Sequence, residues 1–201
     1  MQKYDVIIVG GGVSGLSCAI TLGSAKSKLD IAANKRILII DAGASHLKMA
    51  QLYNVPGIAE GTKGPELLAS LAQKAQSYDN VTIMQGTVKS IDGTFGDFKI
   101  STESAESFMA EIIVLANGMQ TIAMDGIGAA VVENIRAPRP NMVMIENNNG
   151  IISKGKYVTG CAAGASSMFA TAAGYGVQTA TDIISSWVGK YTVIHDVLAK
   201  N

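Results

Sequence analysis

The sequence predicts an α/β fold of the Rossmann type. We expect a mostly parallel sheet in three layers, with helices on one face and a small antiparallel β-meander on the other. Three observations support this. A β-branched run ending at Val9 leads directly into a glycine-rich turn and a stretch of helical composition. A second apolar run, 36–40, ends in Asp41. Short strand-like runs separated by turn signals fill residues 81–116.

The glycine turn matches the Gly-x-Gly-x-x-Gly fingerprint of dinucleotide-binding βαβ units. Gly10 makes the tight turn, Gly12 lets the backbone approach a pyrophosphate, and Gly15 lets the helix pack closely on the strand. The helix start at Val13 and Ser14 offers free N–H groups and a positive dipole end to phosphates. We therefore predict a dinucleotide site here. The alternative is a glycine-rich turn that binds no ligand.

The end of the second strand indicates where an adenosine would lie. Asp41 occupies the position from which an acidic side chain accepts hydrogen bonds from ribose hydroxyls. The polar residues 26–35 lengthen the connection before this strand. Ala42 and His46 follow in a loop that passes near the predicted cofactor, so both are candidate contacts. For His46 the alternative is a surface loop residue.

Composition narrows the classes of protein. The chain has 201 residues, 48% of them apolar, and a formal net charge of zero, which gives no indication of a nucleic-acid partner. No apolar run is long enough for a membrane span. We expect no cleaved signal peptide, because Asp5 interrupts the apolar N-terminal stretch. The cysteines, Cys18 and Cys161, form no Cys-x-x-C motif, and we expect a cytoplasmic protein.

The rest of the chain divides into short elements. Pro65 suits a first helical turn, and Leu67, Leu68 and Leu71 form an apolar stripe behind it. Small residues dominate the last long helix, which favours close packing against a sheet or a flat ligand. The expected elements are a helix over 62–79, strands over 81–84, 87–91, 95–102, 107–110, 112–116 and 141–145, a strand and turn over 156–160, and a helix over 165–187.

The order of these motifs resembles the FAD-binding half of thioredoxin-reductase-like flavoproteins, within the two-dinucleotide-binding-domain superfamily. The specific features are Asn-Val-Pro-Gly at 54–57, Gly-Pro-Glu-Leu-Leu at 64–68, the strand end Ile-Val-Leu-Ala-Asn-Gly at 113–118, and the glycine- and alanine-rich stretch 160–176. The resemblance implies FAD as the cofactor, with its adenosine toward Asp41.

The chain also departs from that family. The family inserts an NADPH-binding domain that carries a Cys-x-x-C motif, whereas the gap here is far below the roughly 100 residues of a typical domain. We find no second glycine fingerprint. The sequence therefore predicts a single FAD-binding domain over 1–201, in which segments 1–118 and 141–190 are joined by a short connector, 119–140. We do not expect a standard NADPH–thioredoxin reductase.

The flavin end carries three changes relative to the family. Asn117 replaces a Thr, Cys161 replaces an Asp, and Met168 replaces a Gln. The change at Asn117 is mild, whereas the polar partners lost at Cys161 and Met168 cost about 1 kcal/mol each or more. Cys161 is also our candidate for a reactive thiolate at a helix N-terminus, the alternative being a small turn residue. The resemblance implies a cofactor site made of Gly10, Gly12, Val13, Ser14, Gly15, Asp41, Ala42, His46, Asn54, Val88, Ala116, Asn117, Gly118, Gly160, Cys161, Met168 and Phe169.

Two classes of function remain open at this point. The first is a small FAD-dependent oxidoreductase that exchanges electrons with an external donor or partner, with its flavin face covered by a second copy or a partner subunit. The second is a non-catalytic flavin- or nucleotide-binding module, which the changes at Cys161 and Met168 favour. A nicotinamide-nucleotide binder is a further alternative. The sequence contains no acid–base constellation that names a substrate.

Overall fold

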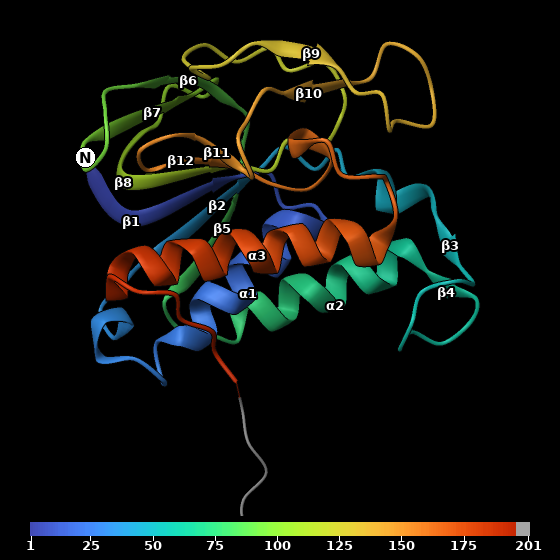
Figure 1. Ribbon diagram of the computed structural model, residues 1–201, viewed down its shortest axis with the longest axis horizontal. Helices are drawn as coiled ribbons and strands as arrows, with labels where there is room; N and C mark the ends of the chain where they lie inside the picture. The colour runs from blue at the N-terminus through green and yellow to red at the C-terminus, as the bar shows by residue number, and fades with distance from the viewer. Residues whose placement is uncertain (196–201) are drawn as a thin grey trace, which may run out of the picture.

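The computed structural model describes residues 1–195 and shows a central sheet of mostly parallel strands. Apolar, β-branched runs build its middle, as expected for strands buried on both faces. Its order is β11-β12-β8-β1-β2-β5, and only β11 runs antiparallel to its neighbour on this path (Figure 1). These strands are β1 (Gln2–Val9), β2 (Ile37–Asp41), β5 (Val81–Gln85), β8 (Ser107–Leu115), β11 (Ile151–Ser153) and β12 (Lys156–Val158).

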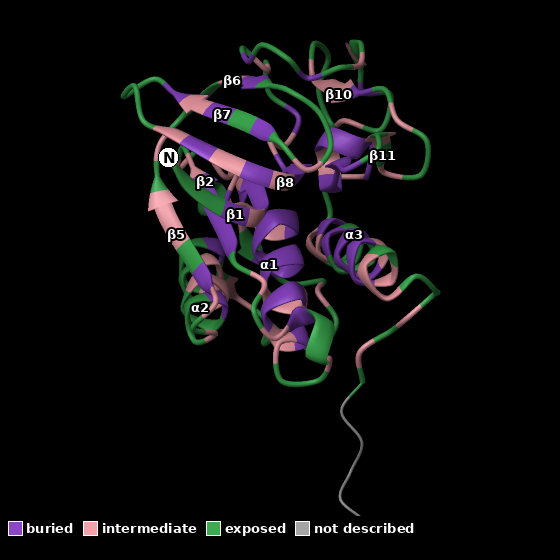
Figure 2. Cartoon of the chain, turned by 90° about the vertical axis from the view of Figure 1, so that its left-hand side faces the viewer, coloured by how far each residue is buried: buried purple, intermediate pink, exposed green. Residues whose placement is uncertain are grey.

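Three α-helices lie together on one face of this sheet (Figure 2). They are α1 (Val13–Ala25), α2 (Gly64–Gln76) and α3 (Phe169–Val188), and short 3-10 turns precede or follow strands at η1 (Asp30–Ala32), η2 (His46–Met49) and η3 (Gly160–Ala163). The backbones of α1 and α3 lie unusually close, because a Cβ at Gly176 would collide with the carbonyl oxygen of Ser14. Ile8 and Ile39 belong to the core between sheet and helices.

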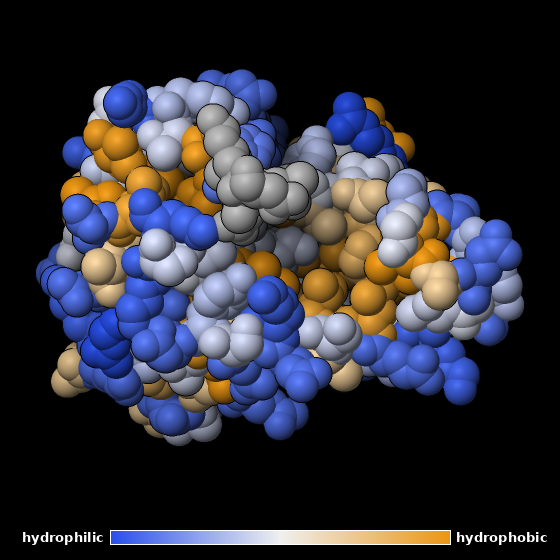
Figure 3. Space-filling model, turned by 90° about the horizontal axis from the view of Figure 1, so that it is seen from below, coloured by the Kyte–Doolittle hydropathy of each residue, from blue (hydrophilic) through white to orange (hydrophobic). Residues whose placement is uncertain are grey.

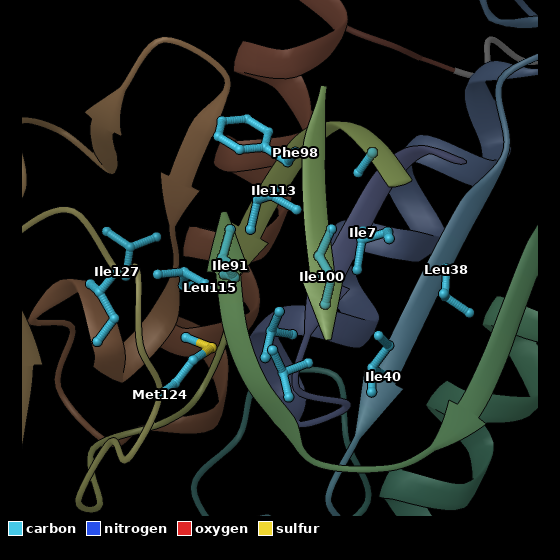
Figure 4. Packing of buried hydrophobic residues seen from close by; sticks show 14 of the residues in the cluster. Ile7, Leu38, Ile40, Ile91, Phe98, Ile100, Ile113, Leu115, Met124 and Ile127 are labelled. Carbon is cyan, nitrogen blue, oxygen red and sulfur yellow. The ribbon is translucent and has the colours of Figure 1, made fainter. Parts of the chain in front are cut away.

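The opposite face carries the antiparallel meander. It consists of β6 (Val88–Asp92), β7 (Phe98–Thr102) and the first half of β8. Ile100 and Phe98 of the meander pack with Ile7 and Ile113 of the main sheet in a second core (Figure 4). Two small hairpins complete the fold, β3 (Gln51–Leu52) with β4 (Thr62–Lys63) and β9 (Val131–Glu133) with β10 (Val143–Ile145). The predicted three-layer Rossmann-type fold is confirmed.

Several element boundaries differ from the prediction. The runs 107–110 and 112–116, expected as two strands, form the single strand β8. It is continuous because it pairs with β1 along its length. On its other edge, the first half of β8 pairs with β7 and its last residues pair with β12. The helix expected over 62–79 is the shorter α2, since Thr62 and Lys63 pair with β3 instead. The sequence also gave no signal for β11.

The connector 119–140 is structured rather than a simple splice. Its middle forms β9, which pairs with β10 from the following segment. The two segments on either side of it share one sheet, because β12 pairs with β8. Residues 196–201, which the predicted domain also included, lie outside the described part of the chain. Over residues 1–195, no helix is long and apolar enough to cross a membrane.

Candidate functional site

The glycine turn between β1 and α1 forms the floor of the site. Gly10 has φ +112°, and a Cβ there would collide with the carbonyl oxygen of Ala116. A Cβ at Gly15 would collide with the carbonyl oxygen of Gly10. The Gly10 N–H donates to Ile40 O at 2.8 Å. Both glycines are therefore required by the packing of this chain on itself, as the fingerprint predicts for the tight turn and the strand–helix contact.

Gly12 is different, because the packing of the chain does not require a glycine at this position. A Cβ at this position would meet only the Ser45 hydroxyl, at the ordinary contact distance of 3.6 Å. Gly12 also precedes the first turn of α1, whose free N–H groups attract anions. A glycine that packing does not require, at a helix N-terminus, fits the approach of a pyrophosphate.

Asp41 is tied to the glycine turn. Its Oδ1 accepts a hydrogen bond from the Gly11 N–H at 2.9 Å, at the carboxyl end of β2. Its Oδ2 has no hydrogen bond within residues 1–195 that would compete with a ligand. The carboxylate therefore holds the turn with one oxygen and offers the other, which fits the predicted ribose contact. Ala42, the next residue, is exposed beside it.

The strand ends opposite the turn leave two buried polar atoms unpaired. Asn117 Oδ1 and Thr159 Oγ1 are shielded from solvent and have no hydrogen-bond partner in the described chain. They follow neighbouring strands, since the Thr159 N–H donates to Leu115 O at 2.9 Å. A buried polar atom without a partner costs about 1–3 kcal/mol. Hydroxyl or amide groups of a bound ligand would satisfy them, so these positions fit a polar cofactor. Gly118, with φ +78°, has open space where a Cβ would stand.

The turn η3 closes the site from the side of α3. A Cβ at Gly160 would collide with Ser14, so η3 packs directly on the start of α1. Two connector residues hold this turn: Asn134 Nδ2 donates to Cys161 O at 3.1 Å, and Arg136 Nη1 donates to Gly164 O at 3.1 Å. Sequence reasoning missed both residues, because the connector has no period or motif. Only the tertiary contact identifies them.

Cys161 does not have the surroundings of a reactive thiolate. Burial raises the pKa of its thiol, against a smaller opposing effect of a backbone hydrogen bond, and the thiol donates to a carbonyl oxygen, Ser166 O at 4.0 Å. Such a thiol stays protonated near neutral pH. The structure therefore favours the small turn residue over the nucleophile. Cys18 is fully buried in α1, and burial raises its pKa strongly.

The predicted helix start at 165 is wrong. Gly164 adopts a left-handed conformation, and the Ala165 N–H turns back to Gly160 O at 3.1 Å, so α3 begins only at Phe169. The helix N-terminus therefore lies four residues further along than expected. Met168, which precedes it, is 47% exposed, and Phe169 is half-buried.

The remaining predicted residues are more scattered. His46 Nε2 lies 2.6 Å from Gln120 Nε2, which links η2 to the start of the connector. Asn54 is exposed in the loop between β3 and β4. Val88 is buried in the meander core, so its side chain is committed to packing. The fold thus gathers the fingerprint, Asp41 and the residues after β8 and β12, while Asn54 lies exposed in its loop and Val88 packs in the meander core.

Comparison with known proteins agrees with this geometry. Residues 4–153 match the family model described as pyridine nucleotide-disulphide oxidoreductase. A thioredoxin reductase of Pneumocystis carinii is 30% identical over 115 residues, covering 56% of this chain and 35% of that protein. One from Rickettsia felis is 26% identical over 167 residues, covering 77% and 51%. The chain thus spans about a third to a half of the length of these relatives.

Solved structures show the same fold. An oxidoreductase from Agrobacterium tumefaciens superposes with a TM-score of 0.76 over 94% of this chain and 99% of that one, at 16% identity. A thioredoxin reductase from Gloeobacter violaceus gives 0.52 over 60% and 36%, at 25% identity. The chain belongs to the pyridine nucleotide-disulphide oxidoreductase family. Membership of this family implies flavin binding.

Proposed function

We propose that this protein is an FAD-dependent oxidoreductase that corresponds to the FAD-binding part of a thioredoxin reductase and exchanges electrons with an external partner. The observation that carries the proposal is the pair of unpaired polar atoms, Asn117 Oδ1 and Thr159 Oγ1, at the ends of neighbouring strands next to the glycine turn. A turn that bound nothing would leave this polar burial uncompensated. The whole chain would then act as one FAD-binding domain.

Each part of the site has a task in this proposal. The α1 N-terminus with Gly12, Val13 and Ser14 would bind the pyrophosphate through backbone N–H groups. Asp41 would orient the adenosine through the ribose hydroxyls. Asn117 would accept a hydrogen bond at the flavin end, on the side of η3 and the start of α3. When bound, FAD supplies the redox chemistry, and the protein tunes it through position and hydrogen bonds.

The matched pair Gly12→Ala and Gly174→Ala tests the proposal. Neither new Cβ meets a clash, at 3.6 Å from Ser45 for the first and with nothing within 4 Å for the second. We expect purified wild-type and Gly174→Ala protein to show a two-banded flavin spectrum and to release FAD on denaturation. Gly12→Ala should stay folded by circular dichroism but lose most of its FAD. A colourless wild-type protein that FAD does not reconstitute would refute the proposal.

The second candidate is a flavin- or nucleotide-binding module without catalysis. The raised pKa of Cys161 and the apolar Met168 favour it, because the flavin end then lacks a reactive polar side chain. The discriminating measurement is anaerobic reduction of the bound flavin by a panel of donors, such as NADH, NADPH and reduced ferredoxin. Turnover with any of them supports the oxidoreductase, and a flavin that stays oxidised supports the module.

An uncharged surface around the start of α3 suggests where a partner would bind. Residues 157–181 contain no Asp, Glu, Lys, Arg or His, and Met168, Tyr175 and Val177 are exposed at the start of α3. Apolar residues also gather in a hollow on the helix-bearing side (Figure 3). We propose that a second copy or a partner subunit covers this uncharged surface, and that the protein works in the cytoplasm. Sedimentation analysis of the FAD-loaded protein tests the first point.

A further inference from the structure

A second hollow lies away from the glycine turn, beside the end of α3. Its volume is about 570 Å³, within the usual range of small-molecule pockets. Its walls come from η1, from the turn between β6 and β7, from β8, from the hairpin of β11 and β12, and from α3. Trp187 lines it about five helical turns from Phe169, which is about 27 Å along the helix axis. It is therefore separate from the proposed FAD site.

Apolar and aromatic side chains form much of the wall. Three of the exposed large apolar residues of the chain meet here, Ile31 (52% exposed), Phe95 (41%) and Ile151 (45%). Tyr157 and Trp187 complete the lining from the side of the helices. Exposed apolar side chains that converge on a concave surface mark a binding site more often than scattered ones do.

The polar groups of this hollow are mostly hydrogen-bond donors. Lys35 Nζ is already matched by Asp5 at 3.0 Å and Glu111 at 3.2 Å. Lys154 Nζ lies 4.7 Å from the centre of the Phe95 ring, with no carboxylate at ion-pair distance in the described chain. The buried Trp187 Nε1 also has no acceptor there. Asp5 and Glu111 share the one ammonium of Lys35, which also lies 5.3 Å from the centre of the Trp187 ring, so Lys154 is the ammonium of this hollow without a carboxylate partner in the described chain.

We propose that this hollow binds a planar aromatic acid, with the ring between Phe95 and the Trp187 side of the pocket and the anionic group on Lys154. Because the Lys154 ammonium lies over the Phe95 ring and the Lys35 ammonium over the Trp187 ring, a ligand ring would meet these side chains at their edges, a geometry that aromatic pairs favour. The ammonium of Lys154 selects an oxyanion over a neutral substituent. The site is independent of FAD, and its ligand is not the substrate of the flavin chemistry.

Trp187 makes the site directly observable, because it is the only tryptophan in the chain. The probe is 8-anilinonaphthalene-1-sulfonate, an aromatic sulfonate with a planar naphthalene ring, which accepts energy from a nearby indole. We expect saturable energy transfer from Trp187, both in apo protein and in FAD-loaded protein. 2-Naphthoate should displace the probe, and neutral 2-naphthalenemethanol should displace it at least about tenfold less well, as loss of a charge-assisted contact predicts.

Two exposed lysines provide the matched variants. Lys154→Gln should weaken probe binding about tenfold, whereas Lys63→Gln, on β4 and outside this pocket, should leave it unchanged. Trp187→Phe should abolish the energy transfer while directly excited probe still reports binding. Equal affinity for the two lysine variants would overturn the proposal, as would probe binding without energy transfer. Because FAD content is measured separately, failure here leaves the proposed oxidoreductase intact, and the reverse also holds.

Discussion

The thiol of Cys161 illustrates how one side chain limits the chemistry. The sequence resemblance implies an acidic residue at the corresponding position of the family, and a thiolate would restore negative charge there. Burial opposes this, because it disfavours the charged form and raises the pKa. In the proposed FAD site, any proton or electron transfer would then proceed without a cysteine thiolate near neutral pH.

This gives a prediction for pH. Alkylation of Cys161 by iodoacetamide at pH 7.5 should be slower than alkylation of the same cysteine in unfolded protein, and its rate should still be rising above about pH 8.5, where a free thiol ionises. The sign for stability follows from the raised pKa: the folded chain retains a proton that the unfolded chain loses, so this contribution is present below about pH 8.5 and is lost as pH rises.

Peptide mapping by mass spectrometry, with Cys161→Ser as the control, measures the modification at this site alone. Rapid alkylation at pH 7.5 with a rate that no longer changes above pH 7 would contradict the prediction and restore the thiolate candidate.

The two glycines of α3 lie on different sides of the helix, one against α1 and the other exposed. Gly176 faces α1, where a Cβ would collide with Ser14 O, whereas a Cβ at Gly174 would meet nothing within 4 Å. A glycine inside a helix costs about 1 kcal/mol relative to alanine. Packing explains that cost at Gly176. Within the described chain, nothing explains it at Gly174, which lies on the exposed side of the helix.

The two alanine variants should therefore change stability in opposite directions. We expect Gly174→Ala to raise the free energy of unfolding by about 0.5–1 kcal/mol. Gly176→Ala should lower it by about 1–3 kcal/mol, because α3 must move away from α1. Urea denaturation of both variants at a protein concentration low enough to prevent association checks this. Equal effects of the two substitutions would mean that the contact between α1 and α3 is looser than the structure shows.

The fold as a whole depends on the connector between its two segments. Asn134 is buried, donates to Cys161 O and accepts from the Arg136 N–H at 3.0 Å. It therefore joins the hairpin of β9 and β10 to η3, which in turn packs on α1. The connector therefore supports η3, at the flavin end of the proposed site.

Asn134→Ala should remove both hydrogen bonds and lower the free energy of unfolding by about 1–3 kcal/mol. Because η3 carries Gly160 and Cys161, the same variant should also bind FAD more weakly than wild type. Arg139→Ala, an exposed connector residue without such contacts, is the control. Thermal denaturation with and without FAD separates the loss of stability from the loss of FAD affinity. Without FAD, the melting temperature reports stability alone, and the rise on adding FAD reports how tightly the folded state binds it. An unchanged melting temperature for Asn134→Ala would show that the connector is not needed.

The sequence by itself determined the βαβ unit, the position of the glycine turn between its first strand and helix, and the position of Asp41 at the end of its second strand. These are local: a β-branched run, glycines at fixed spacing and an acidic residue at a strand end each act through neighbouring backbone. It also predicted the meander on the opposite face, since turn signals between short strands specify antiparallel pairing.

Only the tertiary structure decided the rest. It joined two predicted strands into β8, because a partner on each edge supports the whole length. It moved the start of α3 to Phe169, because Gly164 turns the chain back first. It also revealed Asn134, Arg136 and the hollow at Trp187, whose residues come from distant parts of the sequence. Such sites carry no sequence pattern, because their geometry arises only when separate elements pack together.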